Sequence, residues 1–216
     1  MKLYDYELSG NCYKVRLLLG FLGVKAEILP VDYFPGAEHR SDWFLDINPL
    51  GQLPVLEDAG ETFRDSQAIL TWLAVTRDGS GAWFPKDDPL RLTRVQQWLA
   101  FADGLTGSLA SARLQSNFSA PGDLAAAQKA GHRLLRVLDE HLWFQEQEGQ
   151  DWIVDGGAPT IADIACFPYV ILSEEGGVSR QDYPAVRRWT DRFRRIPGFA
   201  VMSGVFPASA ARERAA

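Results

Sequence analysis

The residues whose types and spacing could do chemistry lie in one stretch, residues 48–70. Within it, Pro54 follows Leu53 and precedes two apolar residues, a position from which a strand can start. The bond from Leu53 to a proline at such a position can be cis. A cis bond would leave the backbone N–H and C=O of Leu53 free to pair with an extended peptide. We call Leu53 and Pro54 the backbone clamp.

Asp65 and Ser66 form a second chemical feature further along the same stretch. They stand immediately before the periodic apolar residues Ile69, Leu70 and Leu73, which predict a helix that begins at or beside Ser66. The free N–H groups and the dipole of a helix start favour a carboxylate. We call Asp65, Ser66 and this helix start the anion site. A backbone clamp followed by an anion site suits a small peptide better than a nucleotide.

The elements that must position these residues begin with a strand–helix–strand unit. Residues 3–6 and 27–32 have the composition of strands, and apolar residues recur at helical spacing over residues 15–22 between them. This order implies a parallel pair joined by a crossover helix. The Asp-Ala-Gly turn at residues 58–60 then predicts a hairpin, before a last helix that ends near Val75. Such an order is typical of a thioredoxin-like α/β domain.

Composition divides the chain further. Residues 1–77 form the predicted α/β domain, and residues 78–89 form a linker rich in glycine, proline and charge. Strand signals nearly vanish over residues 90–206, where helical periodicity predicts an all-helical bundle. Residues 207–216 are alanine-rich and charged, and they are expected to form a poorly ordered tail.

A capping box marks one helix of the predicted bundle. Thr160 stands three residues before Asp163, ahead of an apolar run. The threonine hydroxyl can cap the helix, and the aspartate carboxylate can accept a bond from the Thr160 N–H. We assign this pair a structural role.

Charge and cysteine content exclude several classes of protein. The 216 residues carry a formal net charge of −6, which argues against a nucleic-acid groove. The N-terminus has acids where a signal peptide would be apolar, and Asp163 and Pro168 interrupt the longest apolar stretches. Cys12 and Cys166 are too few for a disulfide framework. We therefore expect a cytoplasmic protein without a membrane partner.

Taken in order, the motifs Asn-Pro, Leu-Pro-Val-Leu and Asp-Ser-Gln-Ala-Ile at residues 48–49, 53–56 and 65–69 resemble the glutathione site of cytosolic glutathione S-transferases. Residues 183–199 are similar to the last helix of bacterial members, so the resemblance covers nearly the whole chain. It implies an α/β thioredoxin-like N-terminal domain followed by an all-α C-terminal helical bundle. It also implies a detoxifying enzyme that uses glutathione as co-substrate and needs no metal.

The resemblance points to a thiol-activating residue after the first strand. A glutathione transferase must present the glutathione thiol as a thiolate, because the thiol is a weak nucleophile. Ser9 matches the serine of theta-like members and is the first choice for the donor that stabilises the thiolate. Asn11 could donate through its amide, as in some bacterial classes with reductase activity. Cys12 could form mixed disulfides or could be a small buried residue, and Tyr6 lies close by, so the sequence leaves these alternatives open.

The resemblance also implies which residues hold glutathione. Asp65 replaces the commoner glutamate of the family, which shortens the side chain and keeps its charge. The matching positions are Leu53 and Pro54 for the cysteinyl unit, Asp65 and Ser66 for the γ-glutamyl unit, and Gln52 and His39 for the glycyl end.

A pocket for a small apolar electrophile is expected between the domains, on the first helices of the second. Its candidate residues are Phe101, Leu105, Leu109 and Phe118. The resemblance further implies a homodimer with much of its contact on residues 90–109. Two helix aromatics expected to be exposed, Trp98 and Trp143, agree with a dimer, and Asp103 is a candidate to reach the partner's glutathione amine.

Two other functions remain open. The same site could serve a glutathione-dependent reductase, peroxidase or isomerase, as Asn11 and Cys12 suggest. Residues 9–16 loosely resemble maleylacetoacetate isomerase, although the paired serines of that family are missing. A non-catalytic binding protein with the same fold is the third alternative, but a pure scaffold has no need of an anion site.

Overall fold

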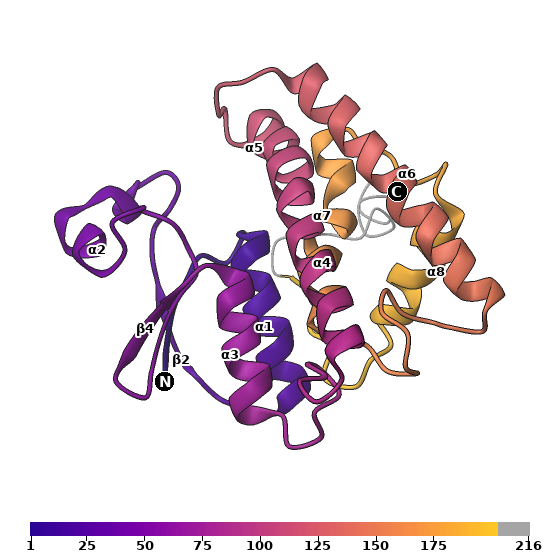
Figure 1. Ribbon diagram of the computed structural model, residues 1–216. Coiled ribbons are helices and arrows are strands. Elements are labelled where there is room, and N and C mark those ends of the chain that lie inside the picture. Colours follow the sequence, from indigo (N-terminus) through magenta and orange to yellow (C-terminus); the bar gives the residue numbers. More distant parts are fainter. Residues whose placement is uncertain (203–216) are drawn as a thin grey trace, which may run out of the picture.

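A computed structural model describes residues 1–202, which form an α/β domain and an all-helical domain side by side (Figure 1). The predicted fold class is confirmed. The predicted tail, residues 207–216, lies outside the described residues. The proposed domain limits remain a prediction, although one helix ends at Arg77 and the next begins at Pro89.

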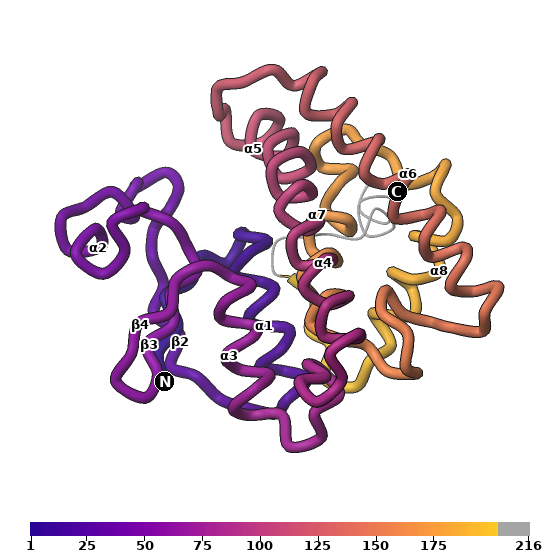
Figure 2. The backbone as a smooth tube through the Cα atoms, viewed as in Figure 1, coloured from indigo at the N-terminus to yellow at the C-terminus, as the bar shows by residue number. Residues whose placement is uncertain are grey.

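The α/β domain is built on a four-stranded sheet with the strand order β2-β1-β3-β4. β1 pairs in parallel with β2, whereas β3 is antiparallel to both β1 and β4. Pro30 ends β2 at the edge of the sheet, where a missing N–H is tolerated. Figure 2 shows β2, β3 and β4 together on one side of α1 and α3. The elements are β1 (Lys2–Asp5), α1 (Gly10–Leu22), β2 (Glu27–Pro30), η1 (Glu38–Arg40), α2 (Asp42–Ile47), β3 (Val55–Asp58), β4 (Glu61–Arg64) and α3 (Ser66–Arg77).

Local signals fix both ends of α1. Ser9 caps its start, because the Ser9 Oγ accepts the backbone N–H of Cys12. Gly23 ends it in the left-handed conformation, with a φ of 64° that favours glycine. The buried residues of α1 pack against the sheet, α3 and α7.

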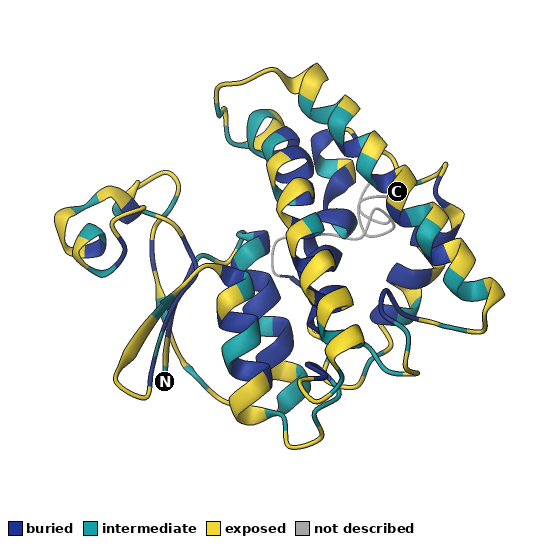
Figure 3. Cartoon of the chain, in the orientation of Figure 1, coloured by how far each residue is buried: buried dark blue, intermediate teal, exposed yellow. Residues whose placement is uncertain are grey.

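The helical domain is organised around α7, whose residues are buried from Ile161 to Val170. α7 packs against α4 on one side and α1 on the other, so its core is continuous with that of the α/β domain. Figure 3 shows α7 largely in the colour of buried residues, while the outer faces of α4 and α6 are exposed. The elements are α4 (Pro89–Leu105), the π-helical turn η2 (Thr106–Ala110), α5 (Ser111–Asn117), α6 (Leu124–Gln147), α7 (Ile161–Ile171), η3 (Ser173–Gly176) and α8 (Pro184–Phe193).

The predicted capping box starts α7. The Thr160 hydroxyl accepts the Ala162 N–H at 3.2 Å, and the Asp163 Oδ2 accepts the Thr160 N–H at 2.9 Å. The other Asp163 oxygen accepts the Ile153 N–H and the Trp189 indole N–H, so one buried carboxylate joins α7, α8 and the loop before α7.

The exposure predicted for Trp98 is wrong. Only 8% of Trp98 is exposed, because the ring packs on Phe101 and on His141 of α6. Trp143 is exposed as predicted, at 47%. Helical periodicity alone did not indicate which face of α4 meets α6.

Within residues 1–202, no helix is both long and apolar enough to span a bilayer. In the same residues, no cluster of three or more His, Cys, Asp or Glu side chains is arranged to hold a metal ion. The cytoplasmic location stays a prediction.

Candidate active site

A cavity of about 520 Å³ opens where the loop after β1 and the starts of α1 and α3 face α4, η2 and α5. It brings together seven residues of the predicted set, whereas Cys12 and His39 do not line it. Those seven are Ser9, Asn11, Gln52, Leu53, Pro54, Asp65 and Ser66.

The backbone clamp is preceded by a loop that the buried side chain of Asn48 stabilises; Asn48 is 1% exposed. The Asn48 amide donates to the Gln52 carbonyl at 2.8 Å, and its oxygen accepts the Leu50 N–H at 3.2 Å. The Leu53–Pro54 bond is cis. Among residues 1–202, the N–H and C=O of Leu53 have no hydrogen-bond partner, so both are available to a ligand.

The anion site lies at the start of α3. Asp65 caps this helix, since its Oδ1 accepts the N–H groups of Gln67 and Ala68 at 2.8 and 3.2 Å. Its φ of 74° is unusual for a residue other than glycine and costs on the order of 1–3 kcal/mol. Ser66 follows with 3% exposure. The surrounding structure thus holds Asp65 in a strained backbone conformation at the N-terminus of α3.

Asp103 of α4 reaches the same cavity from the helical domain. Its Oδ1 accepts the side-chain N–H of Gln67 at 2.5 Å. Asp103 therefore lines the cavity of its own chain and ties α4 to the start of α3.

Ser9 and Asn11 lie where α1 begins. The Ser9 Oγ accepts the Cys12 N–H at 3.2 Å, and a hydroxyl that accepts one bond can still donate its proton. The Asn11 Oδ1 is buried and has no partner within residues 1–202. Tyr6 also lines the cavity and donates to the Phe34 carbonyl at 3.4 Å. Burial raises the pKa of Tyr6, so the phenol stays protonated at neutral pH.

Cys12 lies on the other side of α1, in the core beneath β1. It has no exposed surface, and its sulfur accepts the Tyr6 N–H at 3.4 Å. Burial, helped by the charge of Asp5, raises the pKa of the Cys12 thiol to about 12. A thiol with that pKa is protonated at neutral pH and is a poor nucleophile.

His39 is also set back from the cavity. It is 6% exposed, and its ring stacks on Tyr33 with a centroid distance of 4.0 Å. Burial lowers the pKa of His39, which keeps the imidazole neutral. Tyr33 does line the cavity, so His39 supports the wall there.

The predicted electrophile residues are mostly wrong. Leu105 and Leu109 are core residues with 0% and 1% exposure, and Phe101 packs on Trp98. Only Phe118 lines the cavity, where its ring meets Phe34 edge-on. A helical apolar stripe has the same appearance in sequence whether it faces the core or a cavity.

Sequence analysis missed several lining residues, among them Tyr169, Arg113 and Lys14. Tyr169 of α7 reaches the cavity because Gly10 has no side chain, since a Cβ there would lie 2.6 Å from the Tyr169 ring. Arg113 of α5 donates to the Leu8 carbonyl at 2.7 Å and to Glu175 at 2.5 Å. Lys14 of α1 also belongs to the cavity wall, and its side chain is fully buried.

Comparison with known proteins agrees with this geometry. The family model described as glutathione S-transferase, N-terminal domain, matches residues 3–81, and the one described as glutathione S-transferase, C-terminal domain, matches residues 121–192. Together they cover more than half of the chain. The chain belongs to the glutathione S-transferase family.

Relatives within the glutathione S-transferase family differ in their named activities. The chain is 31% identical to a maleylacetoacetate isomerase of Pseudomonas aeruginosa, over 92% of this chain and 93% of that protein. It is 29% identical to the disulfide-bond oxidoreductase YfcG of Escherichia coli, over 87% of each chain. A solved glutathione S-transferase from Pseudomonas fluorescens superposes with a TM-score of 0.83 at 32% identity, covering 94% of this chain and 98% of that one.

Proposed function

We propose that this glutathione S-transferase binds glutathione in the cavity and activates its thiol with Ser9 for attack on small apolar electrophiles. The observation that carries the proposal is the position of the Ser9 hydroxyl. It lines the cavity at the start of α1, it is oriented by the Cys12 N–H, and its own proton remains free. A donor at a helix N-terminus stabilises an anion more than a neutral group.

Glutathione would lie along the clamp and the anion site. The free N–H and C=O of Leu53, beside Pro54, would pair with the cysteinyl unit. The Asp65 carboxylate would accept from the γ-glutamyl ammonium, and Ser66 would hold the neighbouring carboxylate. Gln52 lines the cavity and is the better candidate for the glycyl end, because His39 lies behind Tyr33.

The apolar electrophile would enter beside the thiol, against the helical domain. The walls of this part of the cavity include Leu8, Leu114, Phe118 and Pro121. Attack by the thiolate forms a carbon–sulfur bond while the leaving group departs with its electron pair.

The proposal is tested with glutathione and an aryl halide activated by nitro groups. We expect saturable conjugation that depends on Ser9, together with retention of the protein on immobilised glutathione. Retention without conjugation would instead favour a non-catalytic binding protein, and absence of retention would contradict the binding site itself.

A reductase is the second candidate, and Asn11 is the observation that favours it. Asn11 lines the cavity beside Ser9, and its amide N–H group is the part of the side chain that could donate to a ligand. An amide that donates to the glutathione sulfur would suit thiol–disulfide exchange, and one relative is named a disulfide-bond oxidoreductase. Reduction of a small dialkyl disulfide by glutathione, lost in Asn11→Ala and kept in Ser9→Ala, would support this reaction over conjugation.

A further inference from the structure

Lys14 is a buried cation that the proposed chemistry does not use. No part of the residue is exposed, and its Nζ has no hydrogen-bond partner within residues 1–202. Lysines are almost never fully buried unless they are paired, and their ammonium groups usually extend to water. A buried ammonium without a partner destabilises the protein, so its position in the wall of the cavity calls for an explanation.

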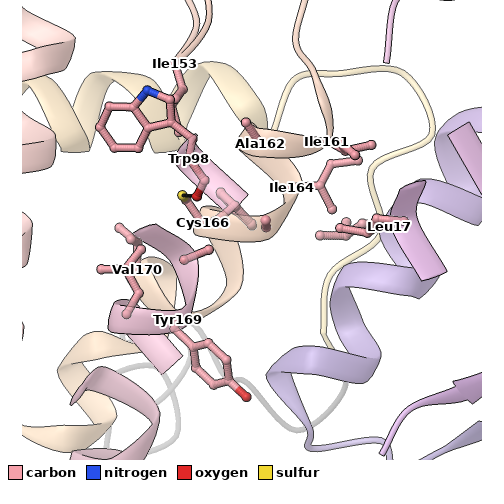
Figure 4. Packing of buried hydrophobic residues seen from close by; sticks show 14 of the residues in the cluster. Leu17, Trp98, Ile153, Ile161, Ala162, Ile164, Cys166, Tyr169 and Val170 are labelled. Carbon is pink, nitrogen blue, oxygen red and sulfur yellow. Dashed lines mark hydrogen bonds between the residues drawn. The ribbon is translucent and has the colours of Figure 1, made fainter. Parts of the chain in front are cut away.

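The groups around Lys14 come from three elements. Tyr169 of α7 presents its ring 5.3 Å from the Nζ, and Cys166 lies on the same helix (Figure 4). Burial raises the pKa of both Tyr169 and Cys166, so both are neutral at physiological pH. The charged groups that act on Lys14 are the carboxylates of Asp65, at the start of α3, and Asp103, on α4.

Two cations, Arg113 and Lys14, line the cavity. Arg113 is already paired with Glu175, and its charge acts on the hydroxyls of Tyr6 and Tyr169. Lys14 lines the same cavity as Asp65 and Ser66, and its Nζ has no hydrogen-bond partner within residues 1–202. The cavity that would receive the γ-glutamyl unit therefore has, among its described residues, a buried cation that forms no salt bridge.

We infer that Lys14 is the buried counter-charge of the anion site, kept for the α-carboxylate of the γ-glutamyl residue of glutathione. This inference rests on the proposed function. The γ-glutamyl end carries an ammonium and a carboxylate on one carbon. Asp65 takes the ammonium, Ser66 and the start of α3 take the carboxylate, and the charge of Lys14 in the cavity wall stabilises that carboxylate.

The protonation state of Lys14 links binding to pH. Burial lowers its pKa to about 8, against the opposing effect of Asp65 and Asp103. A carboxylate brought into the site favours the charged form and raises this pKa again. Binding near pH 8 therefore takes up a proton, whereas binding well below pH 8 finds Lys14 already charged.

The first experiment uses Lys14→Met, which keeps the length of the side chain and removes the charge. Calorimetry would compare glutathione with an analogue in which 4-aminobutyrate replaces the γ-glutamyl residue, so that only the α-carboxylate is missing. We expect the variant to bind glutathione about tenfold or more weakly than the unchanged protein does. Its affinity for the analogue should equal that of the unchanged protein. The exposed Lys129→Met of α6 is the matched control and should change neither affinity.

The melting temperature of the ligand-free variant distinguishes a role of Lys14 in binding from a role in holding the fold together. A lysine that holds the fold together would lower the melting temperature when it is replaced. Removal of an unpaired buried charge should instead raise the melting temperature of ligand-free Lys14→Met by a few degrees. A fall in melting temperature, or an equal loss of affinity for both ligands, would overturn the inference.

A measurement on the unchanged protein needs no variant. S-methylglutathione has no thiol to release a proton, and calorimetry at pH 8 in buffers of different ionisation enthalpy counts the protons exchanged. We expect uptake of about half a proton per site, since a group with a pKa near 8 is half protonated there. The 4-aminobutyryl analogue of this ligand should give much less uptake.

Two outcomes are distinguishable. Equal proton uptake with both ligands would contradict a role for Lys14 at the carboxylate. A protein that binds neither glutathione nor S-methylglutathione would instead refute the proposed function.

Discussion

At the scale of single residues, Ser9 joins a folding role to the proposed chemical one. Its hydroxyl caps α1 and remains a donor toward the cavity. We expect Ser9→Ala to raise the thiol pKa of bound glutathione toward the reference value of about 8.5 and to change affinity little. Conjugation should fall at neutral pH and recover partly as the pH rises. Thiolate absorbance in the ultraviolet, titrated on the complex, measures the shift.

Two further variants control this prediction. Ser9→Thr keeps both the cap and the donor, so it should retain most of the thiolate. Cys12→Ala should leave the thiolate titration unchanged, because the Cys12 thiol is buried and protonated. An unchanged titration in Ser9→Ala combined with lost turnover in Cys12→Ala would reverse the assignment.

Two variants of Asp65 separate the effect of its charge on glutathione binding from its role as the cap of α3. Asp65→Asn keeps an oxygen that can cap α3, and asparagine tolerates a positive φ. It removes only the charge, so glutathione should bind about tenfold more weakly while the melting temperature stays nearly constant. Asp65→Ala also loses the cap and should lower both. Calorimetry and thermal melts on the two variants make the comparison, and unchanged affinity in both would mean that the ligand lies elsewhere.

At the scale of elements, the start of α7 is the most consequential local signal. Thr160→Ala removes a single cap and should lower the free energy of unfolding by about 0.5–2 kcal/mol. Asp163→Ala should cost more, since it leaves the N–H groups of Thr160, Ile153 and Trp189 without an acceptor in the core. Urea unfolding followed by far-ultraviolet circular dichroism measures both. Equal costs for the two variants would show that Asp163 does no more than cap the helix.

Sequence predicted those elements whose signals are local. The Thr160 cap and the turn before β4 each depend on a few neighbouring residues, and each is present in the structure. Helical faces were predicted less well. Leu105 and Leu109 have the right period to line a cavity, yet they face the core, because the partner of a helix is set by distant parts of the chain.

At the scale of the whole molecule, the cavity is a product of two domains. The motif residues come from the α/β domain and were found by their order in the sequence. Tyr169 and Arg113 come from α7 and α5, and no local pattern indicates that they meet Ser9 or Asp65. Lys14 lies on α1 itself, but its burial depends on α7 packing against it. The long-range half of the site therefore required the structure.

Assembly is the remaining whole-molecule prediction. Apolar side chains lie exposed on the α/β domain and on the first helix of the helical domain: Leu50 is 70% exposed, Val75 of α3 is 43% exposed and Leu90 of α4 is 62% exposed. A stable dimer buries about 800 Å² on each partner, and such side chains would supply part of that area. We expect light scattering at micromolar concentration to give twice the mass of the 216-residue chain.

Two matched variants locate the contact. Leu90→Glu places a charge on α4, and it should shift the mass toward that of one chain because burying an unpaired carboxylate is costly. Phe144→Glu changes a residue of similar exposure, 54%, on α6, and it should leave the dimer intact. Dissociation by Phe144→Glu alone would move the interface to α6, and the single-chain mass for the unchanged protein would refute the dimer.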